Sequence, residues 1–338
     1  MKEQMEAAKA AKVPEIPRKR FNVRTVAPLF GVIFVTLLFA ILTKGSILKL
    51  SNIEVIINQA VFTILAGTGA VFVYAYGGID LSIGALQGIC SLVVVLLLRA
   101  GCPAPLTLVA SIATGLLSGL LTGGLSVWLG IAVFITSLCM NFIMRGILQT
   151  VTATAMMYIP PEFAATDNWT LKVIVLLIVL AIGFYVFNFT RVGKYERAIG
   201  GNPKAAELAG VNTRKYRILA HVLLGGAVGV VGFFAAARGG AVYPQSGSGF
   251  EMDVLIALVL GGLSLSGGAS CKLRCAVIGA LTIAVMSNGF ILLGAPQNAI
   301  EGIKGFIFIA VVALSYERTR GQVIKLSLIH ISEPTRPE

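Results

Sequence analysis

Charged residues are scarce in this chain. Asp, Glu, Lys and Arg make up only 12% of its 338 residues, whereas 57% are hydrophobic. Soluble domains usually carry about 25% charged residues. A chain with so little charge has no means of covering a water-exposed surface, which argues against an ordinary soluble domain. We therefore expect an all-α fold, a polytopic bundle of membrane-spanning helices.

The sequence also lacks the motifs of several chemistries. No HExxH, GxSxG or GxxxxGK[ST] pattern occurs, so neither a catalytic site nor ATP hydrolysis is expected in this chain. There are only two histidines, and His221, at the edge of an apolar run, is interpreted as structural. The five cysteines include Cys271 and Cys275, which are four residues apart with no further metal-ligating residue nearby. We expect free thiols and no metal site.

Long apolar runs are abundant and predict the spans. A spanning helix needs roughly 20 apolar residues. Ten runs are interpreted as spans, several of them shorter than this, with eight to eleven as the compatible range. Glycines four residues apart, such as Gly115 and Gly119 or Gly225 and Gly229, predict close packing of two helices. The ten predicted spans are 25–43, 55–76, 83–98, 106–124, 131–150, 171–189, 218–237, 253–266, 275–293 and 301–316.

The basic residues orient these spans. If the N-terminus is cytoplasmic, the inside segments 1–24, 190–217, 267–274 and 317–325 hold 19 Lys and Arg, and the outside segments hold four. Cytoplasmic loops carry the excess of Lys and Arg, so both ends are predicted to be cytoplasmic. The same distribution explains the net charge of +12 and argues against a nucleic-acid partner.

The two ends of the chain are expected to differ from the rest. The segment 1–24 is too long and too charged for the start of a signal peptide, so the first apolar run is expected to remain as an anchor. The sequence LSLIHISEPTR near the C-terminus resembles a translated sequencing adapter, and 326–338 is interpreted as a non-native tail. The membrane-spanning domain is then predicted over 25–320.

Two similar glycine-containing segments interrupt apolar runs, namely YGGIDLSIG (Tyr76–Gly84) and LGGLSLSGG (Leu260–Gly268). A carboxylate such as that of Asp80 costs about 2.5–3.5 kcal/mol at membrane depth. Irregular backbone is tolerated there only against protein or a watery cavity. An interrupted helix beside a path is therefore expected, and paired interruptions are typical of transport sites built on repeats. The alternative is a cytoplasmic turn in which Asp80 is a solvated cap.

The long polar loop 190–217 contains the pattern of a short capped helix. Asn202 is a favoured N-cap, Pro203 suits the first helical position and Gly210 suits the C-terminal stop. The two turns between them are marginal alone and need a surface to dock on. Docking on another protein is favoured. The alternative is a loop that its basic residues hold at anionic lipid.

These segments together resemble a family, the permease subunits of bacterial ATP-binding-cassette (ABC) importers of the ribose/xylose monosaccharide type. The resemblance runs from about Val55 to Arg320. It is carried, in order, by GGIDLSIG, TRVGKYERAIGGNPKAAELAGVN, GFEMDVLIALVLGGLSLSGG and GALTIAVMSNGFILLG. The loop after LSLSGG, here ASCKLRC, departs from the Gly-rich basic loop common in the family.

The resemblance implies an assembly and a set of roles. Two copies of the permease would pair, a cytoplasmic ATPase would hold ATP and Mg²⁺, and a periplasmic binding protein would deliver the sugar, so no cofactor is expected in this chain. Arg145 is expected only to snorkel. Glu251 and Asp253 are candidates for meeting the binding protein, with ordinary solvated acids as the equally favoured alternative. The residues implied to couple to the ATPase are Gly201, Asn202, Pro203, Ala205, Ala206, Glu207, Leu208 and Gly210. Those implied to line the path are Gly78, Asp80, Ser82, Asn141, Ser264, Ser266 and Asn288.

Other functions fit parts of the pattern. A stand-alone secondary transporter or facilitator would also use broken helices and repeats, but it does not require a docking helix. An ion channel is disfavoured because no filter segment or Arg-rich voltage-sensing helix is present. The cargo stays open among ribose, xylose, other monosaccharides, nucleosides and branched-chain amino acids.

Overall fold

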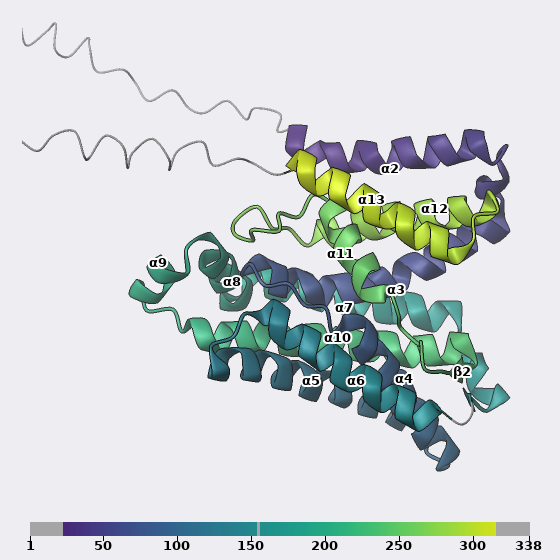
Figure 1. The fold of residues 1–338 in the computed structure, drawn as a ribbon, viewed down its shortest axis with the longest axis horizontal. Coiled ribbons are helices and arrows are strands. Elements are labelled where there is room, and N and C mark those ends of the chain that lie inside the picture. The colour runs from purple at the N-terminus through teal and green to yellow at the C-terminus, as the bar shows by residue number, and fades with distance from the viewer. Residues whose placement is uncertain (1–22, 154–155, 316–338) are drawn as a thin grey trace, which may run out of the picture.

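The computed structural model describes residues 23–153 and 156–315, and these form the helical bundle in Figure 1. The predicted segments 317–325 and 326–338, and all but the last two residues of 1–24, lie outside the described residues. Nine helices match nine of the ten predicted spans. They are α2 (Val23–Leu42), α3 (Leu50–Ala75), α4 (Ile83–Arg99), α5 (Ala104–Leu129), α6 (Val133–Thr152), α7 (Trp169–Phe189), α10 (Thr213–Gly239), α12 (Arg274–Leu292) and α13 (Gln297–Ser315).

Six of these helices are long and apolar enough to cross a membrane by length and composition. The six are α3, α5, α6, α7, α10 and α12, and α4 and the described apolar part of α2 are shorter apolar helices. The chain therefore has the polytopic all-α architecture expected from its sequence.

The tenth predicted span, 253–266, is not a full crossing. Helix α11 (Phe250–Leu260) has 11 residues and is about 16 Å long at 1.5 Å per residue. A hydrocarbon core is about 30 Å thick. The helix ends where Gly262 adopts a left-handed conformation with φ +89°. The apolar run continues beyond this point, but the helix covers only half of the membrane.

The polar elements gather at the two ends of the bundle. Helices α8 (Arg191–Gly201) and α9 (Pro203–Leu208) lie at the same end as the start of α2 and the end of α13 (Figure 1). The strands β1 (Met157–Tyr158) and β2 (Ala241–Val242) pair antiparallel, and β2 lies at the opposite end. The short 3-10 helices η1 (Ser46–Leu48) and η2 (Pro161–Thr166) complete the fold. This arrangement agrees with the topology predicted from the basic residues, although α8 was expected to be loop.

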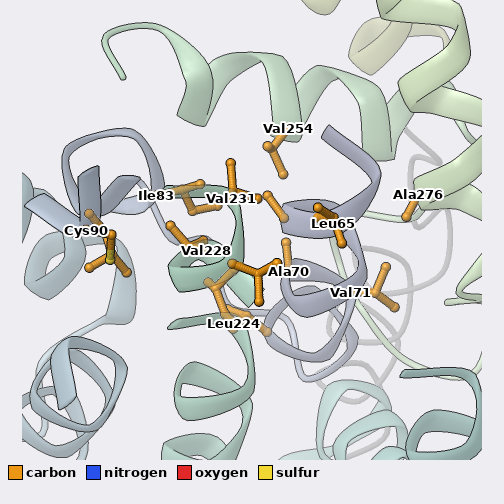
Figure 2. Packing of buried hydrophobic residues seen from close by; sticks show 14 of the residues in the cluster. Leu65, Ala70, Val71, Ile83, Cys90, Leu224, Val228, Val231, Val254 and Ala276 are labelled. Carbon is orange, nitrogen blue, oxygen red and sulfur yellow. The ribbon is translucent and has the colours of Figure 1, made fainter. Parts of the chain in front are cut away.

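The centre of the bundle is α3, which packs against α10, α12, α11 and α7. Of the most apolar 18-residue stretch of α3, 72% is buried inside the protein, compared with 17% of the corresponding stretch of α7 at the periphery. Figure 2 shows the core side chains at this centre, among them Leu65 of α3, Val228 of α10 and Ile83 of α4. Peripheral helices expose large apolar side chains, as expected for surfaces that face lipid.

The predicted glycine packing is confirmed between α5 and α10. A Cβ atom added to Gly115 would overlap the carbonyl oxygen of Gly225, and one added to Gly225 would overlap that of Gly115. One turn along, Gly119 lies against the backbone of His221. Because these residues have no side chain, the two backbones approach closely. This contact fixes the position of His221 in the bundle.

Candidate functional site

The chain between α3 and α4 is a buried helix interruption. Helix α3 ends at Ala75, where Gly77 turns the backbone with φ +86° and Gly78 N donates to Val73 O at 3.0 Å. The following residues do not leave the bundle, since Asp80 is only 2% exposed. The alternative of a solvated cap is therefore wrong, and the interruption lies inside protein as irregular backbone in a membrane requires.

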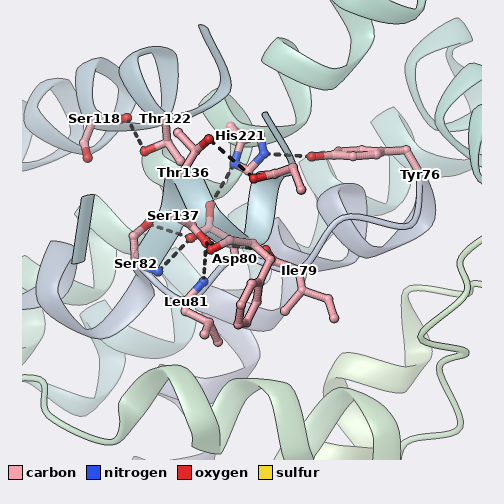
Figure 3. Close-up of polar contacts among 12 residues, drawn as sticks. Tyr76, Ile79, Asp80, Leu81, Ser82, Ser118, Thr122, Thr136, Ser137 and His221 are labelled. Atoms are coloured by element: carbon pink, nitrogen blue, oxygen red, sulfur yellow. Dashed lines mark hydrogen bonds and ion pairs between the residues drawn. The ribbon is translucent and has the colours of Figure 1, made fainter. Parts of the chain in front are cut away.

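The Asp80 carboxylate is held by donors on both oxygens (Figure 3). His221 Nδ1 lies 2.8 Å from Oδ2, and Oδ1 accepts from the backbone N of Ser82 at 2.8 Å and from its Oγ at 2.6 Å. An ionised carboxylate only accepts hydrogen bonds, so the network assigns the proton to Nδ1 of the imidazole. The buried charge is thus paired and hydrogen-bonded, as burial demands.

Tyr76 completes this network from the other side of the imidazole. Its Oη lies 2.8 Å from His221 Nε2, and both side chains are buried. The ring reaches back over Gly78, where an added Cβ would lie 2.5 Å from Oη and 2.6 Å from Cζ. Gly78 is therefore required for the Tyr76–His221 contact. The Tyr76–His221–Asp80 network links the interruption to α10.

Helix α6 fixes the same segment from a second direction. Leu81 N donates to Ser137 Oγ at 3.1 Å, and Asn141 Nδ2 donates to Leu81 O at 2.6 Å. Four predicted path residues, Gly78, Asp80, Ser82 and Asn141, thus come together in one site.

Three residues of this site, Tyr76, Ser137 and His221, were missed as site residues from sequence. Their partners are distant along the chain, and His221 is 141 residues from Asp80. The sequence shows Asp80 and His221 only as isolated polar residues in separate apolar runs, and it does not indicate that they contact each other.

The second glycine-containing segment contacts the first. Gly268 N donates to Ala75 O at 2.9 Å, and a Cβ added to Gly77 would lie 3.5 Å from Ser266 O. Ser264 is half-buried and Ser266 is exposed in this turn. The two similar segments therefore meet at the inner end of the bundle.

Asn288 lies apart from this junction. It is buried in α12 at 4% exposure, and among the described residues it has no hydrogen bond to the Asp80 network. Its place in the path stays a prediction.

The predicted capped helix is present as α9. Asn202 Oδ1 accepts from Ala205 N at 3.0 Å, and Gly210 follows the helix with φ +82°. Leu208 is 80% exposed, an unusual position for a leucine at a polar end of the bundle. Ala206 is only 5% exposed and packs toward the permease itself. The face of α9 that carries Ala206 is thus turned toward the bundle, and a role of Ala206 in coupling stays a prediction.

The exposed face of α9 holds the other predicted coupling residues. They are Gly201, Asn202, Pro203, Ala205, Glu207, Leu208 and Gly210, all of them exposed. A surface for another protein is thus available there, and its use stays a prediction.

Helix α8 packs below the junction of the two glycine-containing segments. A Cβ added to Gly200 would overlap Ala75 O and approach Gly268 N to 2.6 Å. On the same helix Glu196 is fully buried, and its carboxyl oxygens have no hydrogen-bond partner among the described residues. Burial raises the pKa of Glu196 well above its usual range, against a smaller opposite effect of Arg197.

Two of the three charged residues predicted on the outer side, Asp253 and Arg145, have partners inside the protein. Lys304 Nζ of α13 lies 2.6 Å from Asp253 Oδ1 of α11. Glu251 is half-buried beside Gly84, and docking of a binding protein on either acid stays a prediction. Arg145 was expected to snorkel, but its Nη1 donates inward to Ser246 O at 2.7 Å. An unpaired backbone carbonyl provides a better partner than the distant interface.

Taken with the apolar outer surface, this interrupted and internally hydrogen-bonded bundle defines a multi-pass membrane permease. The chain belongs to the family described as the permease component of branched-chain amino acid transport systems, which matches residues 52–312. It is a transport component of the inner membrane.

Curated relatives cover most of the chain. It is 31% identical to the galactofuranose transporter permease protein of Escherichia coli, over 78% of this chain and 79% of the relative. It is 30% identical to the D-allose transport system permease protein of E. coli, over 88% and 94%, and 28% identical to the ribose import permease protein of E. coli, over 80% and 87%. No solved structure matches the chain.

Proposed function

We propose that this chain is the permease subunit of an ABC importer that moves a monosaccharide across the inner membrane. A separate ATPase chain hydrolyses ATP, a periplasmic binding protein delivers the sugar, and a second copy of the permease completes the path. The family match and relatives named for galactofuranose, D-allose and ribose support this proposal.

The proposed mechanism depends on the direct connection of α9 to α10. Helix α9 exposes Leu208 at the inner end and joins α10 through a short turn in which Val211 N donates to Ala206 O at 3.0 Å. Helix α10 begins at Thr213, where Asn212 Oδ1 caps Lys215 N. His221 lies about 12 Å along α10 at 1.5 Å per residue. A push on α9 therefore reaches Asp80 through one rigid helix.

The network at the interruption explains how this push alters the path. Movement of α10 displaces His221 relative to Asp80 and Tyr76, whose hydrogen bonds set the position of the interrupted segment. Ser137 and Asn141 hold the same segment to α6, so a shift of α10 against α6 changes the conformation between them. Packed elements with two discrete arrangements transmit motion in this way.

The names of the relatives, more than the charges of the site, support a sugar cargo. Two carboxylates are paired, Asp80 with His221 and Asp253 with Lys304, while Glu251 Oε2 has no hydrogen-bond partner within the described residues. The hydroxyl groups of a sugar can be bound by single hydrogen-bond donors and acceptors of the protein and do not need an opposite charge.

Reconstitution in proteoliposomes tests the proposal. The permease is combined with the ATPase and binding protein encoded beside it, and uptake of radiolabelled D-ribose, D-allose and D-xylose is measured with and without ATP. Uptake should require all three components and ATP. Equal uptake in the absence of the ATPase would instead establish a stand-alone carrier.

The coupling surface has its own matched pair of variants. Leu208→Arg should abolish uptake and weaken ATPase binding, because a charge replaces the exposed apolar anchor. Leu208→Met keeps the apolar surface and should retain uptake. Normal uptake by Leu208→Arg would show that the ATPase does not dock on α9.

A further inference from the structure

The loop Tyr243–Gly249, between β2 and α11, lies directly on α4. A Cβ added to Gly88 would lie 2.7 Å from Ser246 O, and one added to Gly84 would overlap Gly247 O. The two glycines are one turn apart on α4, so this turn has no side chain where the loop lies. The loop leads from the outer end of the bundle to the start of the half-length helix α11.

Arg145 holds this loop in place. Its Nη1 donates to Ser246 O at 2.7 Å, and within the loop Tyr243 N donates to Ser246 Oγ at 3.0 Å. Gly247 and Gly249, next to the held residue, have φ values of +75° and +80°. These residues provide backbone freedom on the α11 side of the contact. The loop is thus attached by one charge-assisted hydrogen bond beside two hinge positions.

Two acceptor oxygens lie unused where the loop covers α4. Gln87 Oε1 and Glu251 Oε2 are both inaccessible to solvent, and neither has a hydrogen-bond partner within the described part of the chain. They flank the same loop residues. A Cβ added to Gly247 would lie 3.3 Å from Gln87 Oε1, and one added to Gly84 would overlap Glu251 Oε2. Buried acceptors without donors are unfavourable, and such atoms call for an explanation.

A polyhydroxylated neutral solute supplies the missing donors. Its hydroxyl groups would donate to Gln87 Oε1 and Glu251 Oε2, and its oxygens would accept from the Arg145 guanidinium once Ser246 O is released. Mere packing of the loop accounts for Gly84 and Gly88, but it leaves both acceptors unsatisfied.

We infer that Tyr243–Gly249 is the outer gate of the path, that Arg145 holds it closed, and that Gln87 and Glu251 bind the hydroxyl groups of the sugar as the gate opens. This inference rests on the proposed function for the identity of the cargo.

The gate is connected to the inner end of the bundle by α11. Glu251 is the second residue of this helix, and the turn after its last residue, Leu260, leads to Gly268, which binds Ala75 O. Opening the gate therefore moves a helix whose other end contacts the inner glycine-containing segment. Alternating access requires a connection of this kind between the two sides.

Thiol labelling tests the gate without transport. The five native cysteines are replaced by serine, Gln87→Cys is introduced, and the reconstituted permease is labelled from its outer face with an impermeant maleimide. Removing the Arg145 contact by Arg145→Ala should raise the labelling rate about tenfold, equivalent to about 1.4 kcal/mol in the gate equilibrium. Arg238→Ala, an arginine of α10 that does not hold the loop, should leave the rate unchanged.

Arg145→Lys is the control for misfolding. Lysine keeps a hydrogen-bond donor for Ser246 O, so this variant should be labelled as slowly as the protein with Arg145. Equal labelling of wild type, Arg145→Ala and Arg145→Lys would overturn the gate. This result is independent of ATP and of the cargo, so it is distinguishable from a failure of the proposed function, which would appear as no ATP-dependent uptake by the wild type.

Uptake tests the hydroxyl-binding groups in the complete transporter. With radiolabelled D-ribose, D-allose and D-xylose, Glu251→Leu and Gln87→Leu should each lower uptake about tenfold, which corresponds to about 1.4 kcal/mol of lost binding. ATP hydrolysis and assembly with the ATPase should persist, and Gln87→Glu should keep uptake because it keeps an acceptor. Wild-type uptake by both leucine variants would overturn this part of the inference.

Discussion

Asp80 Oδ2 lies 2.8 Å from His221 Nδ1, and this contact joins two residues that are 141 positions apart in the sequence. The pair is buried on both sides, at 2% and 1% exposure. It connects the interrupted segment between α3 and α4 to the helix that follows α9. In the proposed mechanism, this contact is where movement of α9 and α10 would reach the interrupted segment.

Breaking this pair from one side should destabilise the permease strongly. His221→Ala leaves the Asp80 carboxylate buried without its imidazole, and losing one partner of a buried pair costs about 3–5 kcal/mol. The double variant Asp80→Asn/His221→Ala should be less destabilised than the two single variants combined, because the orphaned charge is gone. Thermal unfolding of the detergent-purified protein measures both. Strict additivity would show that the two side chains do not interact.

Gly78→Ala should remove the tyrosine from the network. The new methyl group occupies the space of the Tyr76 ring, so the ring must leave His221 Nε2, at a cost of about 1–3 kcal/mol for overpacking. Gly201→Ala is the control, because open space surrounds that position. A drop in unfolding temperature is expected for Gly78→Ala alone. Equal values for both variants would contradict the packing of Tyr76 over Gly78.

The contact of α5 and α10 gives a sharper matched pair on one helix. Gly115→Ala places a methyl group against the backbone of Gly225 and should force the helices apart, at a cost of about 1–3 kcal/mol. Gly124→Ala, where an added Cβ meets nothing within 4 Å, should be neutral or stabilising, since alanine is favoured over glycine in helices by up to about 1 kcal/mol. Unfolding in detergent should separate the two variants, and a stabilised Gly115→Ala would refute the close approach.

The sequence was sufficient for nine of the ten predicted spans and for the capped helix. Apolar runs of membrane length and positions such as Asn202 act locally, so they are readable without the fold. The contacts of Asp80 with His221 and of Arg145 with Ser246 were not predictable, because each depends on which helices become neighbours.

The sequence also did not predict which face of a helix is buried or where a short helix ends. Whether Ala206 faces inward is decided by packing on α8 and α10, and not by its neighbours in the chain. The end of α11 at Leu260 is set by Gly262, which a hydropathy window averages away.

Glu196 should make stability depend on pH. Its folded-state pKa is raised above the unfolded value by burial, so the folded state binds more protons than the unfolded state between the two pKa values. Stability is therefore expected to fall as the pH rises from about 4.5, the unfolded value. Glu196→Gln should flatten this dependence in thermal unfolding measured across that range. The exposed Glu207→Gln should leave the profile unchanged, and an identical slope in wild type and Glu196→Gln would contradict the prediction.

Asn202→Ala should weaken transport by destabilising α9. The side chain of Asn202 caps α9 by accepting from Ala205 N, and loss of such a cap costs about 1 kcal/mol. A helix of six residues has little stability of its own, and the loss lowers the equilibrium constant for forming α9 about fivefold. ATP-dependent uptake should fall as the population of formed α9 falls, while the exposed Leu208 is unchanged. Asn202→Asp retains the cap and should retain uptake. Equal losses in both variants would indicate that Asn202 contacts the ATPase directly and does not act through the helix.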